Sequence, residues 1–309
     1  MVVFWIILGI IAFILALVLI ISYICYRLAF FVDRKHQTKG FVMPVGKIYE
    51  EHSDVMKNWA EEVKQMPYEK VSITSFDGLK LCGKYYEYAP HAPIELMFHG
   101  YRGSAERDLC GGVQRCFKLG HSALLVDQRG IGDSDGKVIT FGVNEHKDCL
   151  KWIDFMIERF GKDVKIIICG ISMGASTVLM AAGEELPENV IGVLADCGFN
   201  SAKDIIKSVI KSMGLPENLA YPFVKLGARL YGGFNLEETC AEEALKKCKI
   251  PAIFFHGDTD DFVPCNMSKK NFDSCNSKKR LVTIKGAGHG LSYVIDPDTY
   301  LKELREFFP

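Results

Sequence analysis

Hydrophobic positions follow three successive patterns along the chain, and the first is a continuous apolar run. Residues 2–26 carry no charged side chain, and only Gly9 and Ser22 interrupt the apolar residues. As a helix this run would be roughly 37 Å long, enough to cross a hydrocarbon layer of about 30 Å. No basic segment precedes it and no small-x-small cleavage site follows it, which argues against a cleaved secretory signal. We therefore predict a retained transmembrane anchor over residues 1–27.

Basic residues flank this run on its C-terminal side alone. Arg27, Arg34, Lys35 and Lys39 follow it, and no basic residue precedes it. Because basic flanks resist translocation, this asymmetry predicts a single-pass protein of the cell membrane whose remaining chain faces the cytoplasm. The 11 cysteines are scattered without a C-x-x-C pair, which favours neither a disulfide framework nor a zinc site. We expect them to be small buried apolar residues.

The second pattern is weakly amphipathic and occupies residues 28–66, which we assign to a juxtamembrane connector. Val55, Trp59, Val63 and Met66 recur at helical spacing. This face suits packing against either the membrane or the following domain, and the sequence does not choose between them.

The third pattern begins at residue 68, where short apolar segments alternate with helical ones through a domain predicted over residues 67–309. Residues 71–76 and 79–86 surround an Asp-Gly turn and predict a β-hairpin. The later strands are mostly apolar, which indicates burial on both faces in a mostly parallel sheet flanked by helices, the α/β class. Strands are predicted at 94–98, 122–126, 164–169 and 190–195, and helices at 105–119, 144–160 and 175–185.

The alternation stops over about residues 198–248. Helix-like segments fill this stretch at 202–213, 219–230 and 236–248, and strands resume at 253–256 and 281–284. An insertion between central strands covers the carboxyl edge of the sheet, where open α/β sheets bind ligands. We predict a helical lid here; the alternative is a set of surface helices with no role in access.

Composition narrows the function classes. The chain has 309 residues, 49% of them hydrophobic, with 37 basic and 38 acidic side chains and a net charge of −1. These values exclude a disordered protein and a small disulfide scaffold. They also lack the positive field that holds phosphates, so we predict no nucleic-acid partner. No H-E-x-x-H, Walker or G-x-G-x-x-G motif occurs, and we predict neither a metal nor an organic cofactor.

A G-x-S-x-G motif at residues 170–174 predicts a nucleophilic serine. The motif follows a predicted strand and opens a predicted helix, as a nucleophile elbow requires. The sharp turn crowds the backbone around Ser172, and Gly170 and Gly174 relieve the crowding. The turn also places the Met173 N–H in the first turn of a helix, where negative charge is favoured.

A serine nucleophile needs a base and an orienting acid, which follow it in the order acid, then histidine, on this architecture. His289 lies in a glycine-rich loop directly after the last apolar strand and is the predicted base. The acid is expected after the preceding strand, which offers Asp258, Asp260 and Asp261. We choose Asp260, since the other two have ready roles as cap or turn residues. Asp196, at the end of the strand before the predicted lid, is the alternative candidate for the acid.

The developing oxyanion needs a second donor besides Met173. Residues 99–103 follow a predicted strand, and the Tyr101 N–H is the natural candidate. His99, in the same segment, is expected to be structural.

The motifs together resemble the α/β-hydrolase superfamily over residues 68–309, in particular its serine aminopeptidase-like and monoglyceride-lipase-like hydrolases. Four motifs carry the resemblance: H-G-x-x-G at 99–103, D-Q-R-G-I-G-D-S at 127–134, G-x-S-x-G at 170–174, and H-G-x-x-D-x-x-V-P at 256–264 followed by the G-x-G-H loop that ends at 289. The resemblance implies a triad of Ser172, Asp260 and His289, an oxyanion hole formed by the Tyr101 and Met173 amides, and structural roles for Asp127 and Arg129. The chain departs from the family's pattern at Tyr101, where many lipases and esterases have further glycines, and in its N-terminal anchor.

The predicted chemistry is hydrolysis of carboxylic esters through an acyl-enzyme. The apolar lid and the anchor favour an acyl-chain or lipid-like substrate, as for a carboxylesterase, a lysophospholipase or a monoacylglycerol lipase. An aminopeptidase or acyl-peptide hydrolase is the first alternative, with lid glutamates holding a free amine. The second alternative is a catalytically inactive membrane scaffold that keeps the hydrolase fold.

Overall fold

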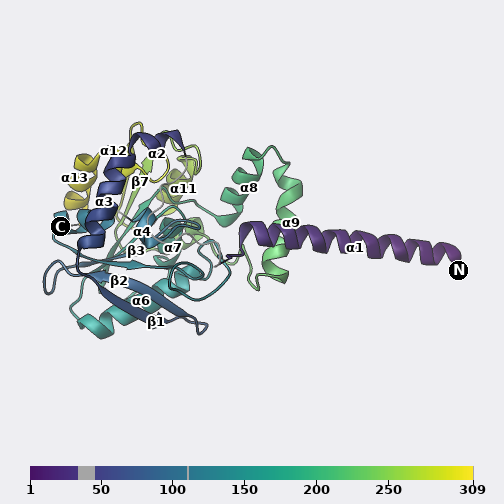
Figure 1. Ribbon diagram of the computed structural model, residues 1–309, viewed down its shortest axis with the longest axis horizontal. Coiled ribbons are helices and arrows are strands. Elements are labelled where there is room, and N and C mark those ends of the chain that lie inside the picture. The colour runs from purple at the N-terminus through teal and green to yellow at the C-terminus, as the bar shows by residue number, and fades with distance from the viewer. Residues whose placement is uncertain (34–45, 110, 309) are drawn as a thin grey trace.

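An eight-stranded sheet forms the centre of the molecule in a computed structural model that describes residues 1–33, 46–109 and 111–308 (Figure 1). The strands are β1 (Glu69–Thr74), β2 (Lys80–Tyr86), β3 (Ile94–Phe98), β4 (Ser122–Val126), β5 (Ile166–Ile171), β6 (Val190–Asp196), β7 (Ala252–Gly257) and β8 (Lys279–Ile284). Their order is β1-β2-β4-β3-β5-β6-β7-β8, and β2 alone runs antiparallel to its neighbours. The predicted hairpin and the mostly parallel sheet are confirmed.

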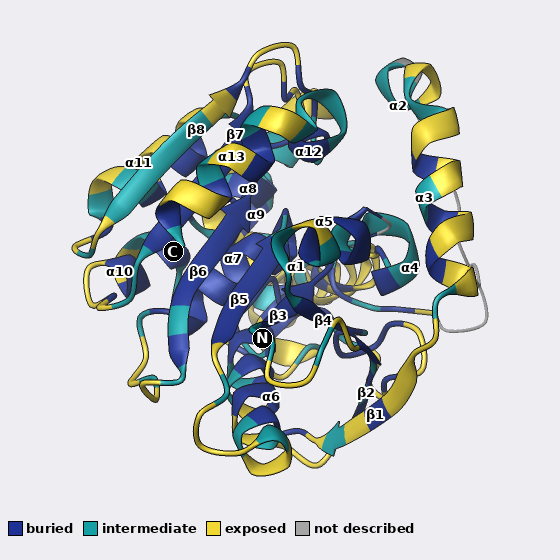
Figure 2. Ribbon diagram, turned by 90° about the vertical axis from the view of Figure 1, so that its left-hand side faces the viewer, coloured by how far each residue is buried: buried dark blue, intermediate teal, exposed yellow. Residues whose placement is uncertain are grey.

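Helices cover both faces of this sheet, and Figure 2 shows the central strands β5 and β6 buried between them. On one face Leu96 and Phe254 pack with α6 (Glu145–Phe160), α7 (Met173–Ala181), α10 (Ala241–Leu245) and α11 (Asn266–Ser274). On the other face Met97 and Ile253 pack with α3 (Ser53–Gln65), α5 (Gly112–Leu119) and α13 (Pro297–Phe307). Two short helices, α4 (Ala105–Asp108) and α12 (Ser292–Ile295), complete this layer. Because helices bury both faces of the sheet, side chains on both faces of a central strand are apolar. This explains why these strands show little alternation of polar and apolar residues.

Two predicted helices are shorter than expected. The helix predicted over 105–119 is split into α4 and α5, and Gly111 lies between them. A Cβ on Gly111 would lie 2.6 Å from the Trp59 ring, so only a glycine fits between the two helices at this position. The helix predicted over 236–248 is reduced to α10, and Glu237 in the preceding turn is bound by Tyr221 and Lys225.

The N-terminal helix α1 (Val2–Ala29) projects away from the sheet and packs near its end against α9 (Glu217–Leu230), which in turn packs against α8 (Ala202–Ser212) (Figure 1). It is long and apolar enough to cross a membrane. A Cβ on Gly227 would lie 2.4 Å from the Ser22 carbonyl oxygen, so a glycine is needed where the two helices cross. The Tyr231 hydroxyl donates to the Leu19 carbonyl at 3.1 Å. The α8–α9 pair is therefore attached to α1 as well as to the sheet domain.

The connector helices α2 (Lys47–Glu51) and α3 pack against the sheet domain. Trp59 stacks on Tyr293 with ring centroids 5.2 Å apart, and Gln114 donates to the Trp59 carbonyl at 2.9 Å. The buried side of α3 carries Met56, Ala60 and Val63, whereas Val55 of the predicted face is exposed. The preceding part of the connector, with Arg34, Lys35 and Lys39, lies outside the described residues.

The cysteines match the expectation of buried apolar residues in part. Ten lie in the described residues and all ten are free thiols, whereas Cys110 lies outside them. Buried cysteines are Cys116, Cys149, Cys169, Cys197, Cys248 and Cys275, and partly exposed ones are Cys25, Cys82, Cys240 and Cys265.

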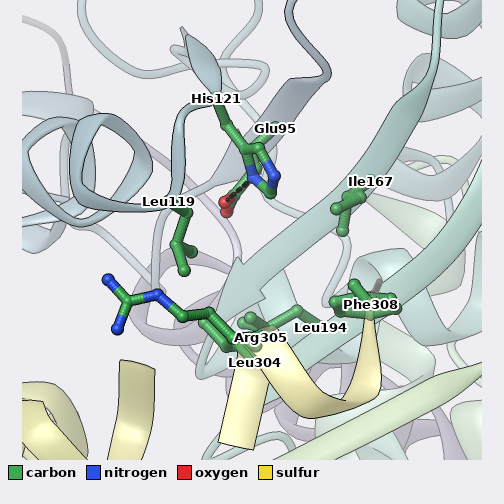
Figure 3. Close-up of a pocket in the computed structure, with 8 residues that line it drawn as sticks. All are labelled: Glu95, Leu119, His121, Ile167, Leu194, Leu304, Arg305 and Phe308. Atoms are coloured by element: carbon green, nitrogen blue, oxygen red, sulfur yellow. Dashed lines mark hydrogen bonds and ion pairs between the residues drawn. The ribbon is translucent and has the colours of Figure 1, made fainter. Parts of the chain in front are cut away.

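A buried charge cluster marks the amino edge of the sheet, beside a cavity of about 40 Å³ (Figure 3). Glu95 pairs with Arg115 and with His121, whose Nδ1 lies 2.9 Å from the carboxylate. Burial raises the pKa of Glu95, but these two partners outweigh it and lower that pKa to about 2. The cluster ties α5 and the start of β4 to β3 at the edge of the sheet opposite the predicted site.

Candidate active site

Ser172 occupies a sharp turn between β5 and α7, with a positive φ of 55°. A Cβ on Gly170 would lie 2.2 Å from the Gly174 carbonyl, and a Cβ on Gly174 would lie 2.1 Å from the Phe98 carbonyl oxygen. Both approaches involve backbone atoms, so no side chain fits at either position. The structure thus supplies the steric reason for the two glycines of the motif. The Ser172 amide donates to the Asp196 carbonyl at 2.8 Å, which fixes the turn against β6.

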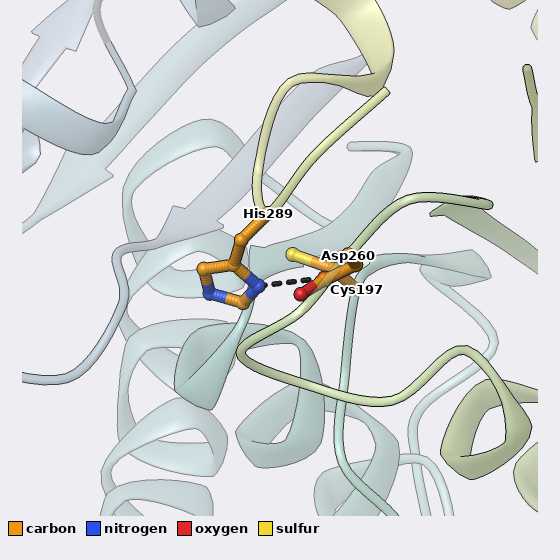
Figure 4. A group of neighbouring side chains, drawn as sticks. All are labelled: Cys197, Asp260 and His289. Carbon is orange, nitrogen blue, oxygen red and sulfur yellow. Dashed lines mark hydrogen bonds and ion pairs between the residues drawn. The ribbon is translucent and has the colours of Figure 1, made fainter. Parts of the chain in front are cut away.

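The structure brings Ser172, His289 and Asp260 together. His289 Nε2 lies 2.9 Å from Ser172 Oγ, and His289 Nδ1 lies 2.8 Å from an Asp260 carboxylate oxygen, the contact drawn in Figure 4. The three residues follow β5, β7 and β8, parallel strands whose carboxyl ends meet at one edge of the sheet. A proton on Nδ1 satisfies the carboxylate and leaves Nε2 free to accept the serine proton. The arrangement can therefore activate the hydroxyl as a nucleophile.

Hydrogen bonds hold Asp260 as a carboxylate. One of its oxygens accepts from the amides of Phe262 and Val263 at 3.0 and 2.8 Å. The other lies 3.1 Å from Nε2 of the buried His256. Burial raises the pKa of Asp260, but the bonds from His256, His289 and the backbone outweigh it and hold that pKa well below its usual range. The group that orients His289 is thus ionised at neutral pH.

The other candidate acids have different partners. Asp258 accepts from the Gly286 amide at 2.6 Å, a bond to the loop after β8 and not the local cap or turn contact expected from the sequence. Asp196 accepts from the Ser292 hydroxyl at 2.8 Å, and Asp261 is exposed. Among the described carboxylates, Asp260 is the one paired with His289.

The loop after β3 lies against Ser172. A Cβ on Gly100 would lie 3.4 Å from Ser172 Cβ, and the Gly100 amide donates to Asp108 at 2.8 Å. Tyr101 follows in this loop, and Met173 begins α7, where helix geometry gives its amide no acceptor. These two amides belong to the segments that flank the serine hydroxyl.

Three residues named in the sequence analysis have structural partners instead of site contacts. The buried His99 ring lies 2.8 Å from the Gly100 carbonyl oxygen and accepts from the Gln128 amide at 3.0 Å. The Asp127 carboxylate accepts from the Asp133 amide at 3.1 Å. Arg129 is bound at 2.8 Å by Asp148 and at 3.0 Å by Asp77. These bonds shape the loops around the site.

Two residues beside the triad were not identified from sequence. His256 lies in β7 with Nδ1 2.7 Å from the Ser268 hydroxyl, and its only sequence signal was its place in the H-G-x-x-D motif. Tyr49, from α2, donates its hydroxyl to the His289 carbonyl at 2.8 Å. Burial, and then the nearby Cys197 and Asp260, raise the pKa of Tyr49. No local pattern relates residue 49 to residue 289.

Cys197, Asp260 and His289 form a group whose ligand atoms lie within 4.8 Å of one another (Figure 4). A metal would require a thiolate and a free lone pair on the imidazole. Burial raises the pKa of the Cys197 thiol, and His289 Nδ1 is engaged with Asp260. The donors thus fit a hydrogen-bonded acid and base better than a set of metal ligands.

Comparisons with known proteins agree with this fold. A family model described as "alpha/beta hydrolase fold" matches residues 96–220. The uncharacterized protein YqkD of Bacillus subtilis is 27% identical over 250 residues, 80% of this chain and 81% of its own. Protein bem46 of Schizosaccharomyces pombe is 23% identical over 70% of this chain and 68% of its own. The esterase Pf2001 of Pyrococcus furiosus superposes with a TM-score of 0.65 at 22% identity, covering 87% of this chain and 96% of that one. An esterase of Exiguobacterium antarcticum superposes with a TM-score of 0.57 at 17% identity, covering 77% and 98%.

Proposed function

We propose, from the premise that the chain belongs to the α/β-hydrolase superfamily, that it is a membrane-anchored serine hydrolase acting on carboxylic esters. The observation that carries the proposal is the continuous chain of hydrogen bonds from Ser172 through His289 to Asp260, at 2.9 and 2.8 Å. The two esterases of similar fold support esters as the substrate class.

In the proposed reaction Ser172 Oγ attacks the ester carbonyl while His289 Nε2 takes its proton. The Tyr101 and Met173 amides bind the oxyanion that develops on the former carbonyl oxygen. His289 then protonates the leaving alcohol, and an acyl-enzyme remains. Water, deprotonated by His289, releases the acid and restores the serine. Asp260 stabilises the imidazolium through both steps.

The surroundings of the site support a substrate with an acyl chain. Met173 and Tyr101 belong to one apolar cluster with residues of α8, α9 and the end of α1. Met213, Leu215, Leu219 and Leu230, which lie in α9 and in the segment between α8 and α9, are exposed. We assign this pair to the lid, whereas α10, which packs on α7, belongs to the body of the domain.

A retained anchor is supported by the end of α1, which is built into the domain. Ser22, Tyr26 and Phe30 are buried there. A cleaved signal would remove these side chains from the apolar cluster. At 28 residues, α1 is about 42 Å long, so its last turns extend beyond a hydrocarbon layer of about 30 Å.

We place the domain on the cytoplasmic side, because Arg27 is the first basic residue and follows the apolar run. Intact cells treated with an impermeant thiol reagent should leave the partly exposed Cys82 and Cys265 unmodified. Modification of either cysteine without permeabilisation would reverse the assigned topology.

Two glutamates of the stretch predicted as a lid, about residues 198–248, lie outside the α8–α9 pair and give little support to the peptidase alternative. Glu237 is bound by Lys225 and Tyr221, and Glu242 accepts from Asn200 at 2.9 Å. These carboxylates are therefore engaged, whereas a peptidase needs one available to hold a free amine.

The substrate class is tested with full-length protein in lipid nanodiscs, using aryl esters of graded acyl length beside a thioester and an aminoacyl arylamide. We expect kcat/KM to rise with acyl length, since an apolar site favours each added methylene by roughly 0.8 kcal/mol at most. The arylamide should be the poorest substrate. A preference for the arylamide would favour the peptidase, and a wild type that turns over none of them would favour the scaffold.

A further inference from the structure

The end of the apolar helix α1 is bonded to the loop that carries one of the proposed oxyanion donors. The Tyr101 hydroxyl donates to the Ala29 carbonyl at 2.8 Å. Arg102 Nη2 donates to the carbonyls of Leu28 and Phe31 at 2.9 and 3.0 Å. The last carbonyls of a helix lack helical partners and attract cations. Both side chains therefore bind atoms that the helix leaves unsatisfied.

This end of α1 cannot drift away from the domain without breaking other contacts. Phe30 is fully buried, and its ring centroid lies 5.7 Å from that of Phe141 and 5.3 Å from that of Phe234. The Val32 amide donates to the Lys137 carbonyl, and the Ile139 amide donates to the Phe30 carbonyl, both at 2.8 Å. The carbonyls that Tyr101 and Arg102 bind are therefore at fixed positions relative to the sheet.

The loop itself needs such support. Arg102 has a positive φ of 51°, a left-handed conformation that is strained for a non-glycine residue. Two positions earlier, Gly100 lies against Ser172. A shift of the loop would thus move the Tyr101 amide relative to the serine hydroxyl.

We propose that the last turn of α1 positions the oxyanion hole, with Arg102 as the positioning residue that joins the two. This inference rests on the proposed function and adds that the anchor takes part in transition-state stabilisation. Removal of one oxyanion donor costs about 10²–10³-fold in kcat. A donor that is displaced but still present should cost less, on the order of 10-fold.

The test compares Arg102→Ala with Arg305→Ala in the full-length protein in nanodiscs. Arg305 is a matched control, because it too is an arginine that donates to a carbonyl near a helix end, that of Lys118 at 3.0 Å, away from the site. For Arg102→Ala we expect kcat to fall about 10-fold with KM nearly unchanged. Affinity for a trifluoromethyl ketone, which forms an oxyanion on Ser172, should fall by the same factor. Arg102→Lys should recover most of both losses, and Arg305→Ala should change neither.

Three results would overturn the inference. One is an Arg102→Ala kcat equal to that of Arg305→Ala. Another is a lowered kcat with unchanged affinity for the ketone. That result would show that Arg102 does not affect binding of the oxyanion. If Arg102→Ala does not fold, Tyr101→Phe decides: it removes one hydroxyl, and an unchanged kcat would contradict the proposal. A wild type that the ketone does not inhibit would instead reject the proposed function itself.

Discussion

Replacing Ser172 by alanine should lower ester turnover by about 10⁴-fold or more, because the acyl-enzyme can no longer form. The substitution removes only Oγ, whose partner is His289, so the fold should remain intact. Turnover of a short aryl ester by full-length protein measures the effect. Ser176→Ala is the matched control: Ser176 lies one turn later in α7 and donates to the Phe199 carbonyl at 2.8 Å, away from His289. That variant should keep most of the activity.

A fluorophosphonate probe, which reacts with an activated serine, tests whether the wild-type protein has a nucleophilic Ser172. The wild type and Ser176→Ala should be labelled, and Ser172→Ala should not. If the wild type resists labelling while folded, the chain is a scaffold with a hydrolase fold.

The second large effect concerns the acid. Asp260→Asn should lower kcat by about 10⁴-fold, because a neutral amide neither fixes the Nδ1–H tautomer of His289 nor stabilises the imidazolium. KM should change little, since the carboxylate lies behind the imidazole and is not expected to contact the substrate. Steady-state kinetics on the same ester provide the measurement.

Asp258→Asn and Asp196→Asn are the controls for this substitution. Each keeps one side-chain oxygen, which can still accept from the Gly286 amide or the Ser292 hydroxyl, and loses the negative charge. We expect both to retain activity within about 10-fold of wild type when folded, since neither touches His289. If Asp196→Asn lowers kcat more than Asp260→Asn does, Asp260 is not the acid of the triad.

The sequence contained enough information to predict the sheet and the three converging side chains. Apolar runs located the strands, and parallel strands bring their carboxyl ends to one edge, so residues 172, 260 and 289 converge once the strand order is known. The choice among the aspartates rested on local cap and turn chemistry. Asp258 instead accepts a bond from a distant loop, the Gly286 amide, and the local turn bonds from the Phe262 and Val263 amides are accepted by Asp260 itself.

Contacts made by the N-terminal segment could not be predicted in this way. Tyr49 reaches the His289 carbonyl across 240 positions, and Tyr101 reaches Ala29 across 72. Neither pair belongs to a periodic pattern, so no local signal marks it. The need for glycine at position 111 has the same origin, since it comes from Trp59, a ring of a distant segment.

The isolated β-bridge between Phe31 and Val138 can form only after both residues have been synthesised, which sets an order of events in biogenesis. The ribosome makes Val138 more than a hundred residues after Phe31, which at about 5–20 residues per second is a delay of roughly 5–20 s. During that interval the N-terminal helix, as the proposed anchor, can be delivered to the bilayer, because Phe141 and Phe234, against which Phe30 packs, have not yet been made. Under the proposed anchoring, the domain then closes around a helix that is already inserted.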